Sequence, residues 1–142
     1  APRLSVATIS TAMDVGNPSN FARMLDLFDH DVSRMREEIT GYSSSDDETR
    51  AVIREVHKEH GYLLDPHGAV GLLGLRKYRE KDNRGEVGIV LATAHPAKFG
   101  DVLEPIVGKV GVPERLAACL GKPKQAVPLA NPFALLKGLL VQ

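Results

Sequence analysis

The chain has 142 residues, 43% of them hydrophobic, and its 18 basic residues balance its 18 acidic residues to give no net charge. This length and composition indicate about one ordinary folded domain and argue against wholesale disorder. The lack of a basic excess argues against a nucleic-acid-binding protein. The lack of an apolar run of roughly 20 residues argues against a membrane-spanning one.

The cysteine content and the start of the chain favour a reducing, cytoplasmic location. Cys119 is the single cysteine, so no internal disulfide can form. Residues 1–10 lack the basic and apolar regions of a secretory signal peptide. Five histidines and one cysteine without ligand-type spacing predict no metal site.

The first part of the chain is expected to form a short strand and then two helices. Residues 4–9 have weak β character. Asn17 before Pro18 predicts a helix over about 18–29, because asparagine caps helix starts and proline has its φ already set. A polar helix over about 30–40 is expected to follow.

The next helix carries the clearest start signal in the sequence. Ser45 with Glu48 three positions later predicts a capping box, in which each residue satisfies a backbone N–H of the other. Gly61 is expected to end this helix in the left-handed conformation.

Asp65 before Pro66 predicts another helix, over about 66–80. Apolar residues occupy most of its circumference, so we expect it to be buried. Three glycines would let a neighbouring element or a ligand approach it closely: Gly68, Gly71 and Gly74.

Residues 86–92 form a continuous apolar run, typical of a strand covered on both faces of a sheet. The chain offers only 4–9 as a partner, and an unpaired buried strand leaves its backbone N–H and C=O groups unsatisfied. The missing strands are therefore expected from polypeptide outside this chain. We predict an α/β fold, mostly helices with one or two strands of a larger sheet. Exposure of 87–92, or the absence of a strand there, would contradict this inference.

Helices are expected from Pro96 onward, over 113–120 and over 133–140. Thr93, His95 and Lys98 lie at the junction between the predicted strand and the first of these helices. Ligands of open α/β sheets bind beyond the carboxyl ends of strands, facing helix starts. This hydroxyl, imidazole and ammonium group therefore form a candidate binding site. The alternative is a capped turn with Lys98 in solvent.

Two other helix starts are candidate sites. Asp65 or His67 could face a cofactor, or Asp65 could serve only as a helix cap. Asn17, Ser19 and Asn20 surround a helix start whose free amides could hold an anion such as phosphate. The same three residues could instead form an ordinary polar loop.

Three stretches together resemble the threonine synthases of bacterial and fungal type. They are residues 10–21, 65–70 and 92–99, which occur in the family's order and spacing. Thr-Ala-His-Pro-Ala-Lys-Phe at 93–99 is the most specific string. The resemblance covers nearly the whole chain and weakens after about Gly108.

The resemblance implies a pyridoxal-phosphate enzyme that converts O-phosphohomoserine and water to threonine and phosphate. It implies the fold type II architecture of the tryptophan synthase β-like enzymes, with residues 1–142 as a C-terminal segment of the large cofactor-binding domain. The family's Schiff-base lysine lies in a Ser-Phe-Lys-Asp string near its N-terminus, and this chain has no such string. We therefore expect no catalytic residue here, and a chain that is inactive alone and needs the N-terminal part as its partner.

The resemblance also implies roles for matched residues. Thr93 would hydrogen-bond the pyridine nitrogen of the cofactor, and Asp65 and His67 would lie near the cofactor ring. The substrate would lie near five residues: Asn17, Ser19, Asn20, His95 and Lys98.

Two alternatives remain at this point. An independent α-rich binding or regulatory module related to the family would fold as a cooperative monomer with no exposed sheet edge. A different pyridoxal lyase, such as threonine dehydratase, is disfavoured by the string at 93–99.

Overall fold

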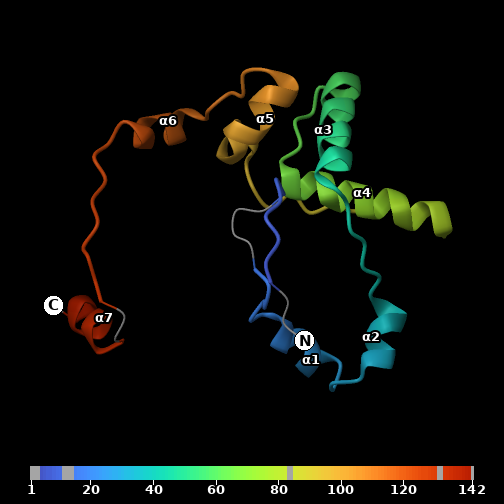
Figure 1. The fold of residues 1–142 in the computed structure, drawn as a ribbon, viewed down its shortest axis with the longest axis horizontal. Helices are drawn as coiled ribbons and strands as arrows, with labels where there is room; N and C mark the ends of the chain where they lie inside the picture. Colours follow the sequence, from blue (N-terminus) through green and yellow to red (C-terminus); the bar gives the residue numbers. More distant parts are fainter. Residues whose placement is uncertain (1–3, 11–14, 83–84, 131–132, 142) are drawn as a thin grey trace. The chain divides into compact units, whose positions relative to one another are not determined.

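The computed structural model describes residues 4–10, 15–82, 85–130 and 133–141 (Figure 1). The chain divides into two units, residues 1–111 and residues 112–142. The first unit contains α1 (Phe21–Leu27), α2 (Val32–Glu38), α3 (Asp46–His60), α4 (Pro66–Lys81), the 3-10 helix η1 (Pro96–Phe99) and α5 (Gly100–Val107). The second contains α6 (Glu114–Leu120) and α7 (Phe133–Leu140).

The core of the first unit lies where α3, α4, η1 and α5 meet. Its buried side chains come from α3, from the start of α4 and from the segment 99–110. They are Val52, Ile53, Val56, Leu64, Ala69, Phe99, Leu103 and Val110. Because Leu64 and Phe99 are far apart in sequence, this cluster fixes the start of α4 beside η1.

The predicted capping box at the start of α3 is confirmed. The Ser45 side chain accepts a hydrogen bond from the Glu48 backbone N–H at 3.2 Å, and the Glu48 carboxylate accepts from the Ser45 N–H at 2.7 Å. Gly61 ends the helix with φ of 64°, as predicted. Local sequence therefore sets both ends of α3.

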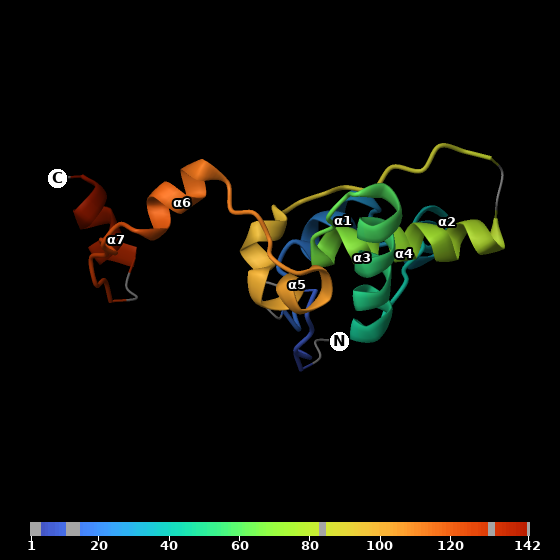
Figure 2. The same cartoon turned by 90° about the horizontal axis from the view of Figure 1, so that it is seen from above.

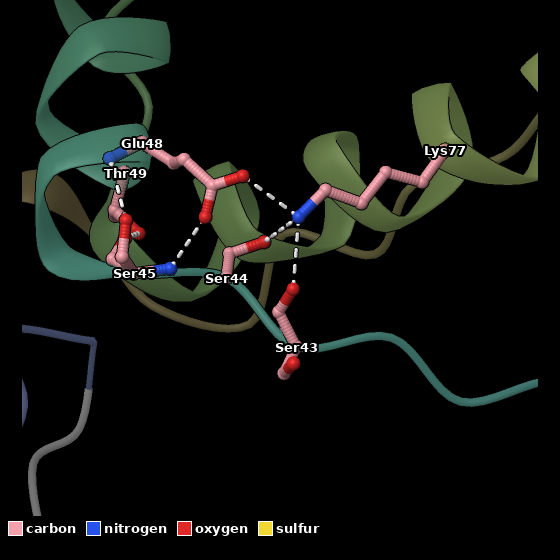
Figure 3. Close-up of polar contacts among 6 residues, drawn as sticks. All are labelled: Ser43, Ser44, Ser45, Glu48, Thr49 and Lys77. Atoms are coloured by element: carbon pink, nitrogen blue, oxygen red, sulfur yellow. Dashed lines mark hydrogen bonds and ion pairs between the residues drawn. The ribbon is translucent and has the colours of Figure 1, made fainter.

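A lysine from α4 joins this cap, as Figure 3 shows. Lys77 Nζ donates to Glu48 Oε1 at 2.8 Å and to the Ser43 carbonyl at 2.8 Å. The hydrogen bond from Lys77 to Glu48 lowers the pKa of Glu48 most, and with the bonds from Ser45 it brings that pKa to about 2. A second ion pair links α3 and α4. The two terminal guanidinium nitrogens of Arg76 donate to the Glu55 carboxylate at 2.7 and 2.9 Å. The hydrogen bond from Arg76 lowers the pKa of Glu55.

The start of α4 is as predicted, but its burial is not. Asp65 caps the helix and Pro66 is its first residue. Only Pro66, Gly68 and Ala69 of α4 are buried, and from Tyr78 onward the helix is exposed. The prediction of a helix buried along its length is wrong, because the elements that pack on α4 in this chain reach only part of its surface.

The predicted start of α1 is also wrong. The helix begins at Phe21, with Asn20 at the N-cap position and no side-chain cap bond. Asn17 and Pro18 precede it, and the Pro18 carbonyl accepts from the Phe21 N–H at 3.2 Å. The predicted polar helix is present as α2, and Asp31 caps it by accepting from the N–H groups of Ser33 and Arg34.

Neither predicted strand is present in the described part of the chain. Residues 4–8 and 86–92 have no ladder partner, and Val87, Ile89 and Leu91 are 90%, 81% and 76% exposed. The predictions that 4–9 and 86–92 form strands, and that 86–92 is covered on both faces, are therefore wrong for this chain. The physical reason is that a strand requires a neighbour to accept and donate its ladder bonds. The inference that other polypeptide supplies missing strands loses the observation on which it rested, because 86–92 is exposed and is not a strand.

Residues 86–92 instead run back along α4 (Figure 2). An ideal Cβ at Gly71 would lie 3.2 Å from Val90 Cγ1, so the predicted close approach at this glycine is confirmed. At Gly88 the corresponding atom would lie 2.5 Å from a Leu75 methyl. Alternate residues of the segment therefore contact α4 while the others face away.

The helices of the second unit match the sequence prediction within one residue at each end. Both α6 and α7 contain no buried residue, and α7 exposes Phe133, Leu135 and Leu140. Cys119 is a free, exposed thiol. No helix in the described ranges is long and apolar enough to cross a membrane.

The hydrogen bond between Lys77 and Glu48 makes the free energy of unfolding depend on pH. The pKa of Glu48 falls from 4.5 to about 2 on folding, so the stabilising contribution is complete above pH 4.5 and is lost as the pH falls toward 2. We expect Glu48→Gln to lower the thermal midpoint of the chain at neutral pH, and the difference from wild type to shrink over that window. Asp47→Asn is the control, because it removes a charge from the same helix turn without the Lys77 bond. An equal pH profile for both variants would contradict the assignment.

Candidate functional site

The start of α4 holds the most enclosed pair of polar side chains in the site. The Asp65 carboxylate is 2% exposed, and its Oδ1 accepts from the His67 backbone N–H at 2.9 Å. An ideal Cβ at Gly68 would lie 3.0 Å from Asp65 Oδ2. The small Gly68 therefore leaves room for the carboxylate to fold over the helix start.

Asp65 also fixes the orientation of the His67 ring. His67 Nδ1 lies 3.1 Å from Asp65 Oδ1. A carboxylate only accepts hydrogen bonds, so Nδ1 carries the proton and, in the neutral ring, Nε2 keeps its lone pair. Nε2 makes no hydrogen bond within the described residues, and the His67 side chain is 35% exposed. The pair presents an oriented imidazole at the surface.

His67 joins two of the three predicted stretches. Its ring packs edge-on against Phe99 of η1, with the ring centroids 5.2 Å apart and an interplanar angle of 66°. Phe99 is itself in the core. The two candidate sites are separate in the sequence. The contact between His67 and Phe99 brings the start of α4 and the segment 93–99 together in the structure.

The side chains of the three candidate residues in the segment 93–99 differ in whether they make hydrogen bonds. The His95 ring accepts from the Ala97 backbone N–H at 3.1 Å through Nδ1, and so caps η1. Because Nδ1 accepts, Nε2 carries the proton in the neutral ring. The Thr93 and Lys98 side chains are exposed and make no hydrogen bond or ion pair with another described residue, although the Lys98 backbone N–H donates to the His95 carbonyl at 3.0 Å. The capped-turn alternative therefore describes His95 correctly, while a hydroxyl and an ammonium group remain available to a ligand.

Asn17, Ser19 and Asn20 are all exposed, in the loop before α1. Asn17 and Ser19 line a hollow of about 580 Å³ with residues of α1, and Asn20 does not. No hydrogen bond, ion pair or ring contact joins these three residues to Asp65, His67 or Thr93 within the described ranges. The structure therefore does not unite the third stretch with the other two.

Sequence reasoning missed the part that Phe99 plays. It is the last residue of the string at 93–99, and it connects His67 to the core. The available signal was an aromatic residue just after a helix-starting proline, where it faces inward. No cluster of three His, Cys, Asp or Glu side chains that could hold a metal ion occurs in the described ranges.

Comparison with known proteins places these residues in a family. The family described as "Threonine synthase, C-terminal" matches residues 68–139, just over half of the 142 residues. The chain belongs to the threonine synthase family. It is 38% identical over 142 residues to a protein named threonine synthase from Escherichia coli (strain K12), and the match covers 99% of this chain.

Solved structures agree with this assignment. The crystal structure of threonine synthase from Escherichia coli matches with a TM-score of 0.72 and 38% identity. An X-ray structure of PLP-bound threonine synthase from Brucella melitensis matches with a TM-score of 0.66 and 29% identity, over 98% of this chain. The chain spans 32% of the length of the Escherichia coli protein, so about two-thirds of that relative lies outside the matched region.

The role of Asp65 as a helix cap can be tested in the 142-residue chain. Asp65→Ala removes the acceptor for the His67 N–H and should lower the free energy of unfolding by about 1 kcal/mol. Asp65→Asn keeps a side-chain oxygen at the cap and should change it by no more than a few tenths. Urea unfolding of both variants measures this difference. Equal losses would show that the carboxylate acts through something other than the cap.

Proposed function

We propose that this chain is the C-terminal segment of a threonine synthase that converts O-phospho-L-homoserine and water to L-threonine and phosphate. The observation that carries the proposal is the family match over residues 68–139, together with the PLP-bound relative from Brucella melitensis. In this proposal the 142 residues contribute to the large cofactor-binding domain. The lysine that binds the cofactor comes from the part of the longer protein outside them.

The described residues fit pyridoxal phosphate. When bound, this cofactor supplies an electron sink that stabilises negative charge on the substrate carbon. Its polar atoms need a partner for the ring nitrogen and partners for the ring hydroxyl. Thr93 offers an exposed hydroxyl and His67 an imidazole with one unpaired nitrogen. The neutral Thr93 hydroxyl, unlike a carboxylate, gives little support to a protonated ring nitrogen.

In the proposed cofactor site, Asp65 acts through His67. Its carboxylate is almost fully buried and engaged by two groups of His67, so it is poorly placed to contact a ligand. It keeps the proton of His67 on Nδ1 and leaves Nε2 free to accept a proton from a cofactor or substrate hydroxyl. Asp65 is thus a positioning residue, with His67 and Thr93 making the cofactor contacts.

The substrate-binding residues in this proposal are those with exposed polar groups near the helix starts. His95 caps η1 and Lys98 lies within it. The Lys98 ammonium group, which has no partner among the described residues, suits the phosphate of O-phosphohomoserine. Asn17, Ser19 and Asn20 would form a polar wall contributed by the loop before α1. Their separation from His67 in the chain alone means that the longer protein has to supply the walls between them.

The exposed apolar surface disfavours an independent binding module. The described residues contain no sheet, so the predicted absence of an exposed sheet edge does not separate the two hypotheses. Val87, Ile89 and Leu91, however, face away from α4 and are mostly exposed, whereas an independent module should bury such side chains. The apolar side chains of α7 are exposed as well. Surfaces of this kind are typical of interfaces, and they support a chain that is part of something larger.

Thr93→Val tests the cofactor assignment in the longer protein. Loss of the hydroxyl leaves the ring nitrogen without its partner in a closed site, so turnover should fall by roughly tenfold or more. Thr93→Ser keeps the hydroxyl and should stay near wild type. Steady-state formation of threonine and the visible spectrum of the bound cofactor are the measurements. Unchanged kinetics and spectrum for Thr93→Val would contradict the assignment, and no threonine formation by the wild-type longer protein would contradict the function.

Lys98→Ala tests the substrate assignment. Removing the ammonium group should raise the Michaelis constant for O-phosphohomoserine by roughly tenfold, and affect a neutral analogue much less. Lys109→Ala is the matched control, because Lys109 is also exposed and lies after α5. Equal effects on the charged and the neutral substrate would make Lys98 a surface residue without a role in phosphate binding.

A further inference from the structure

A hollow of about 340 Å³ in the first unit lies between α3, α5 and the N-terminal segment. The two helices pack against each other, as Figures 1 and 2 show. The Ile9 backbone N–H donates to Asp46 Oδ1, at the start of α3, at 3.2 Å, which holds the N-terminal segment at the edge of the hollow. None of the described residues that line it is a candidate cofactor- or substrate-binding residue.

Groups of opposite charge line this hollow without pairing with one another. Arg50 and Arg54 lie one turn apart on α3, and Asp101 lies in the first turn of α5. The side chains of Arg54 and Asp101 make no hydrogen bond or ion pair with any described residue. Arg50 pairs with Asp47 at 3.3 Å, and that carboxylate is 98% exposed. Because an exposed ion pair is weak, Arg50 is free to turn toward a ligand.

Aliphatic side chains complete the wall of the hollow. Ile9, Val102 and Ile106 contribute them, and the last two also pack against the hydrophobic core. This packing holds the α5 side of the hollow in place. A ligand that covers the wall would gain free energy by removing apolar atoms from water. The hollow therefore offers two guanidinium groups, one carboxylate and an apolar surface to a single ligand.

We propose that this hollow binds a free aliphatic α-amino acid. The guanidinium groups suit its carboxylate, which arginine can hold by two parallel hydrogen bonds. Asp101 suits its ammonium group, and the aliphatic wall suits its side chain. An inorganic anion would use only the arginines and would be repelled by Asp101. The volume is at the small end of the range for ligand pockets, roughly 300–1,000 Å³. The proposal goes beyond the proposed function and does not rest on it.

Calorimetric titration of the longer protein with L-leucine tests the ligand class. Three analogues each lack one recognised group: 4-methylpentanoate lacks the ammonium group, 3-methylbutylamine lacks the carboxylate and glycine lacks the aliphatic side chain. Leucine should bind saturably, and each analogue at least roughly tenfold more weakly. Inorganic phosphate should not displace leucine. No saturable binding of leucine would overturn the proposal, and so would equal affinity for leucine and either singly charged analogue.

Two substitutions test which side chain recognises which group. Arg54→Gln should reduce the preference for leucine over 3-methylbutylamine, and Asp101→Asn should reduce the preference for leucine over 4-methylpentanoate. Arg115→Gln and Glu104→Gln are the matched controls, because both residues are exposed and neither lines the hollow. The controls should bind leucine as the wild type does. An equal loss of affinity for every compound in both test variants would overturn the proposal, since it would indicate a changed fold.

The proposed cofactor site needs its own control, because amino acids resemble the substrate of the proposed reaction. Thr93→Val should leave the affinity for leucine unchanged. If it weakens leucine binding as much as Arg54→Gln does, leucine occupies the cofactor site and the proposal is overturned. Leucine binding by a longer protein that forms no threonine would keep the amino-acid site and reject the activity. An active enzyme that does not bind leucine would do the reverse.

Discussion

The backbone groups of residues 87–92 impose the constraint on which the rest of this structure depends. A backbone N–H or C=O removed from water without a partner costs roughly as much as a lost hydrogen bond. The segment lies against α4 with one row of side chains, yet nothing in the described chain pairs with it, and its other row is solvent-exposed. This arrangement is tolerable because water can bond these backbone groups, and the exposed row of side chains gives the unit an apolar surface beside its ordered core.

The candidate site depends on the same segment because Thr93 follows it directly. The start of α4 is fixed from within the chain: Asp65 caps the helix, orients His67, and His67 packs on Phe99 in the core. The Thr93 and Lys98 side chains are exposed, and Lys98 is held by its place in η1. The part of the site on α4 and η1 is therefore preorganised, while Thr93 lies on the exposed segment before η1.

Sequence predicted well those features that are decided within one turn of helix. The capping box of Ser45 and Glu48, the end of α3 at Gly61 and the extent of α7 are local, and all agree with the structure. Predictions that required distant partners failed. Residues 86–92 were predicted as a covered strand from their apolar composition, but composition does not reveal whether a pairing strand lies beside them, and none does in the described residues. Phe99 was missed as a contact of His67 because no local pattern reveals which ring lies 5.2 Å away.

Amide hydrogen exchange of residues 87–92 tests the central claim most directly. In the 142-residue chain these amides have no hydrogen-bond partners, so they should exchange at rates close to those of an unstructured peptide. In the longer protein, if a strand pairs with them, alternate amides should be protected as strongly as those in the middle of α3. Protection of that kind would establish the missing neighbour. Fast exchange of all of these amides in the longer protein would contradict the account.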